Sequence, residues 1–316
     1  MPEPAAACVS SRSPAPGQLL FDAAASSGRV NQEPFAFAHD LHELDLFRSG
    51  SLRMLALRMS RTPEDFFVAH GAPAAGSAFY EVNHGGYLPH VALEHLEARS
   101  LRVILKRPER HDPRFATLMA RLFEQVLELN PALRRDPLVR LESAVFISSA
   151  ATTTPFHYDP EISFFTQIEG EKRYHVFSPT AVREAELEGF FARGARNVGQ
   201  LDLAQRDPAL EYLYALKPGM GFHQPHHAPH WVETGAGRSI SYSIVFETAS
   251  TRLQDRVRSF NHYLRSLGLK PAPLALHPGM DAIKSGAMRL VLPTRRRLGR
   301  AFGRVLGLED PSAYDA

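Results

Sequence analysis

The amino-acid sequence predicts a mainly β fold, an antiparallel sandwich or barrel with helices before and after it. Short runs rich in aromatic and β-branched residues follow one another after residue 139, with glycine and proline between them. Most of these runs have no helical pattern between them, which argues against parallel βαβ units. Apolar residues recur at helical spacing ahead of this region, at 112–131, and again after residue 251.

Composition and charge are those of an ordinary soluble globular protein. The chain has 316 residues, of which 44% are hydrophobic and 22% charged, and this length buries roughly three quarters of the unfolded surface. A net charge of +2 gives no global field that would attract nucleic acid. The single cysteine, Cys8, excludes an intrachain disulfide framework and fits a reducing compartment. No run of about 18 apolar residues and no signal peptide is found, so we expect a cytoplasmic protein.

The first 138 residues divide into a tail and a structured part. Residues 1–30 are rich in alanine, serine and proline without a period, which predicts a disordered tail. Residues 31–138 are expected to form helices and strands that flank the β region. Within them, LDLFRSGSLRMLALRMS mixes helical spacing with a glycine break and predicts a helix with connectors. The segment HVALEHLEARSLRVILKR predicts a short helix followed by a strand.

The clearest helix is DPRFATLMARLFEQVLELNP, at 112–131. Asp112 is of a type that caps helices, and Pro113 suits the first helical turn because its missing N–H is not needed there. Its apolar residues recur at helical spacing: Phe115, Leu118, Leu122 and Val126.

Residues 139–250 contain the predicted strands, and residues 251–316 are predicted to be helical. The strand segments are RLESAVFISSA, ISFFTQI, KRYHVFS, EYLYALK and RSISYSIVFET. In IEGEK a glycine lies between two of these segments, which predicts a hairpin turn. The helical segments that follow include RLQDRVRSFNHYLRSLG and DAIKSGAMRLVL.

Three groups of polar residues in the β region carry candidate chemistry. His157 and Asp159 are two residues apart, so on a strand their side chains point to the same side. Lys172 follows Asp159 by thirteen residues and is one of five lysines in the chain. Four histidines lie in the segment PGMGFHQPHHAPHWVETG: His223, His226, His227 and His230.

These groups together match the requirements of a particular metal chemistry. Two histidines and one carboxylate on one face of a metal ion are the ligand set of non-haem Fe(II) oxygenases, which leaves positions open for a co-substrate and O₂. A buried Lys172 would need an anionic partner, such as the far carboxylate of a 2-oxo diacid, because an unpaired buried ammonium is costly. Each group also has an ordinary explanation when it is taken alone. A pair such as His157 and Asp159 occurs by chance in many proteins. The four histidines are also consistent with a surface loop or a zinc site, and Lys172 with an exposed residue on a strand.

The segment TPFHYDPEISFFTQIEGEKRYHVFSP (154–179) resembles the core signature of the JmjC and cupin-like 2-oxoglutarate oxygenases. It is especially similar to the branch that contains the asparaginyl hydroxylase acting on hypoxia-inducible factor. The resemblance implies a double-stranded β-helix, a jelly-roll of the cupin/JmjC type, at 139–250, with N-terminal α/β elements and a C-terminal helical region. It also implies that His157 and Asp159 bind iron, and that Lys172 and Thr154 bind the C5 carboxylate of 2-oxoglutarate.

The segment PGMGFHQPHHAPHWVE (218–233) is similar to a second block of the same family. Its frame selects His230 as the third iron ligand. His226 or His227 would take this place, or contact substrate, in the alternative interpretation.

Several positions depart from the family pattern. Ser163 stands where the family often has an asparagine that supports the co-substrate, and Ser243 or Val245 occupies the area of a later asparagine. Met220 replaces the usual aspartate of the second block, and Ala228 and Pro229 replace its usual pair of tryptophans.

The resemblance implies an enzyme that uses Fe(II), 2-oxoglutarate and O₂ and releases succinate and CO₂. Hydroxylation of a protein or peptide side chain is the expected reaction. The alternatives are N-methyl demethylation, oxygenation of a small biosynthetic metabolite, a non-oxygenase metal-binding cupin that acts as a sensor or regulator, and a binding module with a decayed site. Lys172 argues against the sensor, and the four intact residues at 157, 159, 172 and 230 argue against decay.

Two further segments are candidates for contacts with substrates or partners. FYEVNHGGYLPH is either a lid or an ordinary turn, and it contains Tyr80, Asn83, His84 and Tyr87. RRRLGRAFGRVLG binds an acidic partner or is a solvated helix face, and it contains Arg295, Arg296, Arg297, Arg300 and Arg304. Because C-terminal helices support homodimers in the family, a homodimer is expected, while nothing indicates nucleic-acid or membrane binding.

Overall fold

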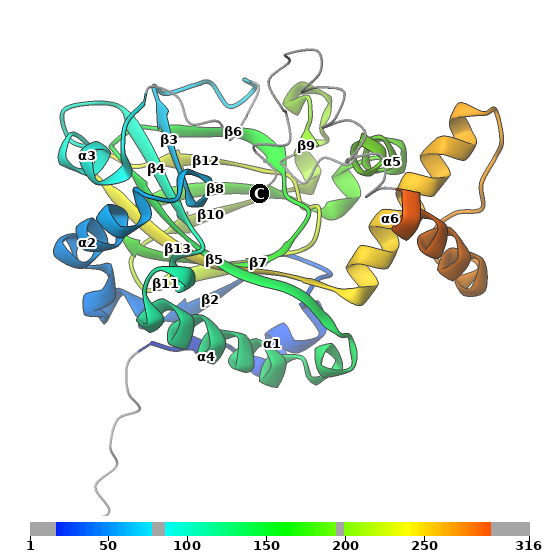
Figure 1. The fold of residues 1–316 in the computed structure, drawn as a ribbon, viewed down its shortest axis with the longest axis horizontal. Helices are drawn as coiled ribbons and strands as arrows, with labels where there is room; N and C mark the ends of the chain where they lie inside the picture. Colours follow the sequence, from blue (N-terminus) through cyan, green and yellow to red (C-terminus); the bar gives the residue numbers. More distant parts are fainter. Residues whose placement is uncertain (1–16, 78–85, 194–198, 292–316) are drawn as a thin grey trace, which may run out of the picture.

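The computed structural model describes residues 17–77, 86–193 and 199–291. Two antiparallel sheets lie at the centre, with helices on one side and at one end (Figure 1). The larger sheet has eight strands in the order β1 (Leu19–Leu20), β2 (Phe35–His39), β11 (Met220–Gln224), β7 (Ile162–Glu169), β13 (Ser239–Thr248), β5 (Leu138–Ser148), β4 (Leu101–Lys106) and β3 (Phe66–His70). The smaller sheet has five strands in the order β10 (Glu211–Leu216), β8 (Lys172–Phe177), β12 (His230–Thr234), β6 (Thr153–Tyr158) and β9 (Gly199–Gln200).

Eight strands between residues 138 and 248 pair in a nested order. β5 pairs with β13, β6 with β12, β7 with β11 and β8 with β10, and all four pairs are antiparallel. Successive strands of this series alternate between the two sheets, except that β8 and β10, at the centre of the series, both lie in the small sheet. The chain therefore behaves as one long hairpin rolled into two layers, which brings β6 and β12 together although about 70 residues separate them.

Apolar side chains from both sheets meet between the layers. Phe165 and Phe222 of the large sheet form one cluster with Tyr174 and Val232 of the small sheet. The ring centroids of Tyr174 and Phe222 are 4.3 Å apart. The two sheets therefore face each other across a packed interior.

The opposite face of the large sheet is covered by helices. In β13, Tyr242 and Ile244 belong to the main hydrophobic cluster on this face, whereas Ser241 and Ser243 point the other way, as strand alternation requires. The helix α4 (Pro113–Leu129) packs here, and the side chain of Asp112 accepts a hydrogen bond from the Arg114 N–H. The predicted apolar face of α4 is buried: Phe115, Leu118, Leu122 and Val126.

The remaining helices lie at the edges of the sheets. They are α1 (Ala23–Ser26), α2 (Ser49–Met59), α3 (Pro89–Glu94), α5 (Glu184–Arg193) and α6 (Ala249–Ser266), and residues 278–291 are also helical. Short 3₁₀ turns cover Ser27–Arg29, Leu41–Glu43, Asp45–Phe47, Pro63–Asp65, Pro108–Arg110, Pro131–Arg135, Pro179–Ala181, Leu203–Gln205 and Pro208–Leu210. The green helix α5 and the yellow-orange helix α6 pack side by side at one end (Figure 1). In the described ranges no helix is both long and apolar enough to cross a bilayer.

Three local predictions differ from the structure. Residues 17–30, predicted to be disordered, form β1, α1 and a 3₁₀ turn because Leu19 and Val30 are buried in the main core; residues 1–16 lie outside the described residues. Gly50 lies within α2 and does not break it. Residues Phe35–His39 form strand β2, which the prediction of a helix with connectors missed.

The hairpin predicted at IEGEK is wrong. Gly170 does turn the chain, with φ +70°, a backbone conformation that favours glycine. However, β7 on one side of the turn belongs to the large sheet and β8 on the other side to the small sheet. A Cβ at residue 170 would clash with the backbone oxygen of Arg238, so the crossing between the sheets itself requires glycine.

Candidate metal centre

His157, Asp159 and His230 come together at one end of the β6–β12 pair in the small sheet. His157 is near the end of β6, Asp159 follows that strand, and His230 begins β12. The two histidines are directly opposite each other in the β6–β12 pairing. This cross-strand register places His230, of the four histidines of its segment, beside His157.

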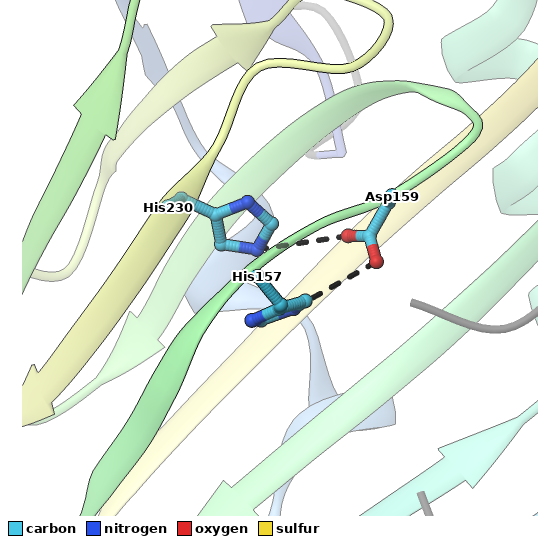
Figure 2. Close-up of side chains that lie close together, drawn as sticks. All are labelled: His157, Asp159 and His230. Atoms are coloured by element: carbon cyan, nitrogen blue, oxygen red, sulfur yellow. Dashed lines mark ion pairs between the residues drawn. The ribbon is translucent and has the colours of Figure 1, made fainter. Parts of the chain in front are cut away.

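The ligand-type atoms of this triad converge on one point. The Nε2 atom of His157 is 3.7 Å from one oxygen of Asp159, and the Nε2 atom of His230 is 3.6 Å from the other. The two imidazole rings have centroids 4.2 Å apart. Figure 2 shows the Asp159 carboxylate turned toward both rings. All three ligand atoms lie within 4.8 Å of one another.

Backbone carbonyls fix the orientation of both imidazoles. Nδ1 of His157 donates to the Pro155 oxygen at 2.6 Å, and Nδ1 of His230 donates to the Ala228 oxygen at 3.2 Å. A carbonyl can only accept, so each Nδ1 carries the proton and each Nε2 presents its lone pair. Burial, with the neighbouring His157, lowers the pKa of His230 to about 3, which keeps this ring in the neutral form that binds metals.

The residues fit a divalent metal with two nitrogen ligands and one oxygen ligand. Bonds of about 2.1 Å place neighbouring ligands of an octahedral ion about 3 Å apart. The observed separations of 3.6 and 3.7 Å reach that value with small side-chain adjustments. The side chain of Asp159 is 32% exposed, whereas both histidines are buried, so one side of the triad is open to solvent.

Lys172 is buried without an anionic partner. Its side chain points between the sheets, with Nζ 5.3 Å from the ring centre of Phe165 and 5.8 Å from that of Phe146. Within the parts of the chain that the structure describes, it makes no hydrogen bond or ion pair. Burial, followed by repulsion from Arg102, lowers its pKa to about 7.

Arg102 is a second buried cation in this area, and it was not among the residues predicted from the sequence. It lies on β4, and its Nη1 donates to the Thr154 hydroxyl oxygen at 2.9 Å and to the Thr153 carbonyl at 3.2 Å. Its charge acts on Lys172, so Arg102, Thr154 and Lys172 belong to one neighbourhood. The available signal was an arginine inside the otherwise apolar start of the strand LRVILK.

The spacing between the triad and Lys172 follows from the strand register. On β8, Val176 is opposite His230, and Lys172 is opposite Thr234. Four residues of strand span about 13 Å between Cα positions. The lysine and histidine side chains extend into this span from its two ends, and a five-carbon dicarboxylate is long enough to bridge the distance that is left between them.

The other predicted site residues have the following positions. Ser163 and Ser243 lie on neighbouring strands of the large sheet, and Ser243 is directly opposite Phe165, whose ring faces Lys172. His223 is a satisfied core residue, because its Nδ1 donates to the Ser163 carbonyl at 3.0 Å and its Nε2 accepts from the Asn31 N–H at 2.8 Å.

His226 and His227 turn away from the triad. Their ligand atoms group with Asp255 of α6 and not with Asp159. This position of the two rings disagrees with the alternative interpretation, in which His226 or His227 replaces His230 as a ligand.

Two candidate segments lie largely outside the described residues. Of the possible lid, Tyr80, Asn83 and His84 are outside them, whereas the Tyr87 hydroxyl accepts a hydrogen bond from Arg99 at 2.7 Å. The arginines of the C-terminal run are all outside them: Arg295, Arg296, Arg297, Arg300 and Arg304.

Comparison with known proteins gives only distant structural likenesses. No protein-family model matches the chain. No curated protein matches it either. An X-ray structure of E. coli ycfD is 17% identical over 87% of this chain and 68% of that chain, with a TM-score of 0.49. A structure of YcfD, a ribosomal oxygenase from Escherichia coli, in complex with cobalt and 2-oxoglutarate is 18% identical over 87% of this chain and 67% of that chain, with a TM-score of 0.48. Likeness at this level carries no argument about chemistry.

Proposed function

We propose that this chain is an Fe(II)- and 2-oxoglutarate-dependent dioxygenase that hydroxylates a C–H bond of its substrate and releases succinate and CO₂. The observation that carries the proposal is the combination of the triad His157, Asp159 and His230 with the ammonium of Lys172, which has no anionic partner among the described residues and lies between the same two sheets. The triad alone would suit many metal sites and the lysine alone many anion sites, but together they supply both ends of a site for a metal-chelating dicarboxylate.

We infer that the nested strand pairing is a jelly-roll. Rolling a long antiparallel hairpin into two sheets gives this architecture, which cupins share. In this arrangement β6 and β12 are neighbours in one sheet, so His157 of β6 and His230 of β12 can bind the same metal ion. The fold thus supports the chemistry by bringing together residues distant in sequence.

The metal end of the site fits Fe(II). Two imidazoles and one carboxylate are the facial set typical of non-haem Fe(II) oxygenases. When bound, the iron would chelate the 2-oxo acid group and provide the site for O₂ activation. The chain itself contributes ligand orientation, because the carbonyls of Pro155 and Ala228 hold both imidazoles with Nε2 toward Asp159.

The other end of the site fits a carboxylate. The Lys172 ammonium has three N–H donors and uses none of them on the described residues. The Thr154 hydroxyl oxygen already accepts from Arg102, so its own hydrogen is free to point toward a ligand oxygen. Binding a carboxylate here would supply the negative charge that the Lys172 ammonium lacks among the described residues.

The substrate class is proposed on the sequence resemblance. Similarity of 154–179 to the asparaginyl hydroxylase branch favours a protein or peptide side chain as the substrate. The solved structures described above are of a ribosomal oxygenase, so the particular branch rests on the sequence motif alone. A small metabolite is the alternative substrate, and a metal-binding sensor is the alternative function.

An anaerobic titration tests the proposal. Protein loaded with Fe(II) is titrated with 2-oxoglutarate while the visible metal-to-ligand charge-transfer band is followed, in the wild type, in Lys172→Ala and in Lys217→Ala. Lys217 is an exposed lysine paired with Glu171 at 3.6 Å and serves as the control. We expect a band in all three proteins and a much higher 2-oxoglutarate requirement only in Lys172→Ala. Iron bound without any band would favour the sensor.

We also propose that the chain forms a homodimer through its C-terminal helices. The helical residues 278–291 expose large apolar side chains: Met280, Ile283, Leu290 and Val291. Exposed apolar clusters of this kind commonly mark interfaces. Light scattering after gel filtration should give twice the chain mass for the wild type and the chain mass for Ile283→Glu/Leu290→Glu. A monomeric wild type at high concentration would exclude the dimer.

A further inference from the structure

A second group of two histidines and one aspartate lies next to the proposed iron site. His226 and His227 are on the loop between β11 and β12, and Asp255 is on α6. The Nε2 atoms of His226 and His227 are 3.6 and 3.4 Å from Oδ1 of Asp255. The ligand atoms of all three residues lie within 4.8 Å of one another. This group is called the loop–helix cluster below.

The converging atoms of the loop–helix cluster are buried and without hydrogen bonds. His226, His227 and Asp255 are 6%, 3% and 8% exposed. Nε2 of each histidine and Oδ1 of the aspartate have no hydrogen-bond partner among the residues that the structure describes. Separations of 3.4 and 3.6 Å exceed those of ordinary N–H···O bonds. Buried polar atoms almost always have a hydrogen-bond partner. Three such atoms that lack one and face the same point therefore indicate that a ligand or an ion binds between them.

The surroundings hold the histidines in this arrangement at a cost. His227 has φ +63°, in the left-handed region that few non-glycine residues adopt. The two imidazole centroids are only 3.3 Å apart. The backbone N–H of His226 donates to the Asn31 side chain at 2.9 Å, which fixes the loop at this position. Such backbone strain and close ring contact persist only where the surrounding structure holds them in place, and an ion bound by both rings would do so.

Charge in the neighbourhood favours neutral imidazoles. Burial lowers the pKa of His226 and His227 well below the ordinary value, and burial raises that of Asp255. Nη1 of Arg258 is 3.8 Å from Oδ1 of Asp255 and donates to Nδ1 of His227 at 3.4 Å, longer than an ordinary hydrogen bond, while its Nε donates to Glu184 at 3.0 Å. Binding of a metal through Nε2 of His227 requires the proton on Nδ1, so this long contact with Arg258 has to be given up. The Nε2–Oδ1 separations of 3.6 and 3.4 Å are too long for ordinary hydrogen bonds, so histidine–aspartate pairing leaves all three atoms unsatisfied, whereas a cation bound between them would satisfy all three.

We propose that His226, His227 and Asp255 bind a second divalent cation, with zinc as the expected ion. Imidazole nitrogen and carboxylate oxygen are ordinary zinc ligands, with bonds of about 2.0–2.2 Å. A tetrahedral ion with such bonds separates its ligand atoms by about 3.3 Å, close to the 3.4 and 3.6 Å observed. A fourth ligand would be a water molecule or the second carboxylate oxygen.

This ion would connect α6 to the loop that carries an iron ligand. His227 is three residues before His230, and the backbone carbonyl of Pro160, the residue after Asp159, accepts a hydrogen bond from the His226 imidazole. The cluster is therefore in contact with both segments that supply the triad. We infer a structural role, because all three ligands are buried, in contrast to the open side of Asp159.

Metal content in a background without the triad tests this site. The double variant His157→Ala/Asp159→Ala is freed of metal, incubated with excess Zn²⁺, desalted and analysed by inductively coupled plasma mass spectrometry. We expect one zinc ion per chain. Adding Asp255→Asn should remove it, and adding Asp281→Asn should not, because Asp281 is also buried but pairs with Lys284 and is not part of the loop–helix cluster. No zinc in the double variant, or zinc that Asp255→Asn leaves in place, would overturn the proposal.

Two further measurements keep the test decisive if Asp255→Asn folds poorly. Co²⁺ added to the double variant should give the visible absorption of a tetrahedral ion with nitrogen and oxygen ligands. Zn²⁺ should also raise the thermal unfolding midpoint of the double variant, because an ion that binds only the folded state stabilises it. A double variant that shows neither the cobalt bands nor the zinc-dependent midpoint lacks the site.

Discussion

The triad and the loop–helix cluster use the same residue types, two histidines and one aspartate, but differ in access and in sequence origin. The Asp159 side chain is 32% exposed, whereas that of Asp255 is 11% exposed. In the triad both histidines have Nδ1 on a backbone carbonyl and lie opposite each other on paired strands. In the loop–helix cluster they are adjacent in sequence on a strained loop. Under the two proposals made for these groups, a similar ligand set would serve chemistry where it is open and structure where it is closed.

The neighbours of the two groups reinforce this difference. Between the sheets that carry the triad lies Lys172, whose ammonium has no anionic partner among the described residues. Beside the loop–helix cluster lies Arg258, whose charge is balanced by Glu184. Only the triad therefore has an unmatched positive charge nearby that would attract an anionic co-substrate.

The largest expected effect comes from removing the triad carboxylate. Asp159→Ala should lower 2-oxoglutarate turnover by more than about 100-fold, because loss of a direct ligand exceeds the 10- to 100-fold typical of residues that only support ligands. Succinate release measures it, with Asp281→Asn as the control. Turnover that survives in Asp159→Ala would break the assignment of the triad as the catalytic centre.

The next effect concerns the proposed carboxylate end of the site. Lys172→Ala should weaken 2-oxoglutarate binding by about 2–3 kcal/mol, roughly 30- to 150-fold, because a buried charged partner is lost. The zinc content of the loop–helix cluster should not change. Isothermal titration and metal analysis on the same sample separate the two sites, and equal losses of both ligands would show that the variant acts through folding.

The pH dependence of co-substrate binding should reflect the lowered pKa of Lys172. Its pKa is lowered from 10.5 to about 7 in the ligand-free protein. Above about pH 7 binding must take up a proton, so 2-oxoglutarate affinity should fall by up to tenfold per pH unit. The stability of the ligand-free protein should instead rise between pH 7 and 10.5, since there the unfolded chain holds a proton that the folded chain lacks. Affinity that is flat from pH 6 to 9 would contradict this role.

The smallest expected effect comes from a single hydroxyl. Thr154→Val should weaken 2-oxoglutarate binding by about 1 kcal/mol, roughly fivefold, because one hydrogen bond of ordinary strength is lost. Thr117→Val, at an exposed hydroxyl on α4, is the matched control. If binding is unchanged in Thr154→Val, the carboxylate of 2-oxoglutarate is bound by Lys172 and Arg102, and the Thr154 hydroxyl does not contribute.

Much of the local structure followed from the sequence. The cap at Asp112 and the apolar spacing of 112–131 predicted α4 with its buried face. Alternation and turn residues predicted most strands after residue 139. The spacing of His157 and Asp159 predicted that both could reach one point, although the expected reason, alternation along one strand, does not hold because Asp159 follows the end of β6.

The partners of these elements depended on the tertiary structure. Gly170 was expected to close a hairpin, but the chain crosses there from one sheet to the other. Arg102 is 52 residues from Thr154, and their hydrogen bond depends on β4 joining β5 in the large sheet. Local patterns carry no information about such pairings.

The sequence by itself determined the kinds of ligand, the close spacing of His157 and Asp159, and the presence of Lys172 after them. Only the tertiary structure decided how four nearby histidines are used. His223 is satisfied in the core, His226 and His227 face Asp255, and His230 faces His157. The physical reason is that strand register and helix docking are long-range: β12 must pair with β6, and α6 must pack over the loop, before these side chains have neighbours.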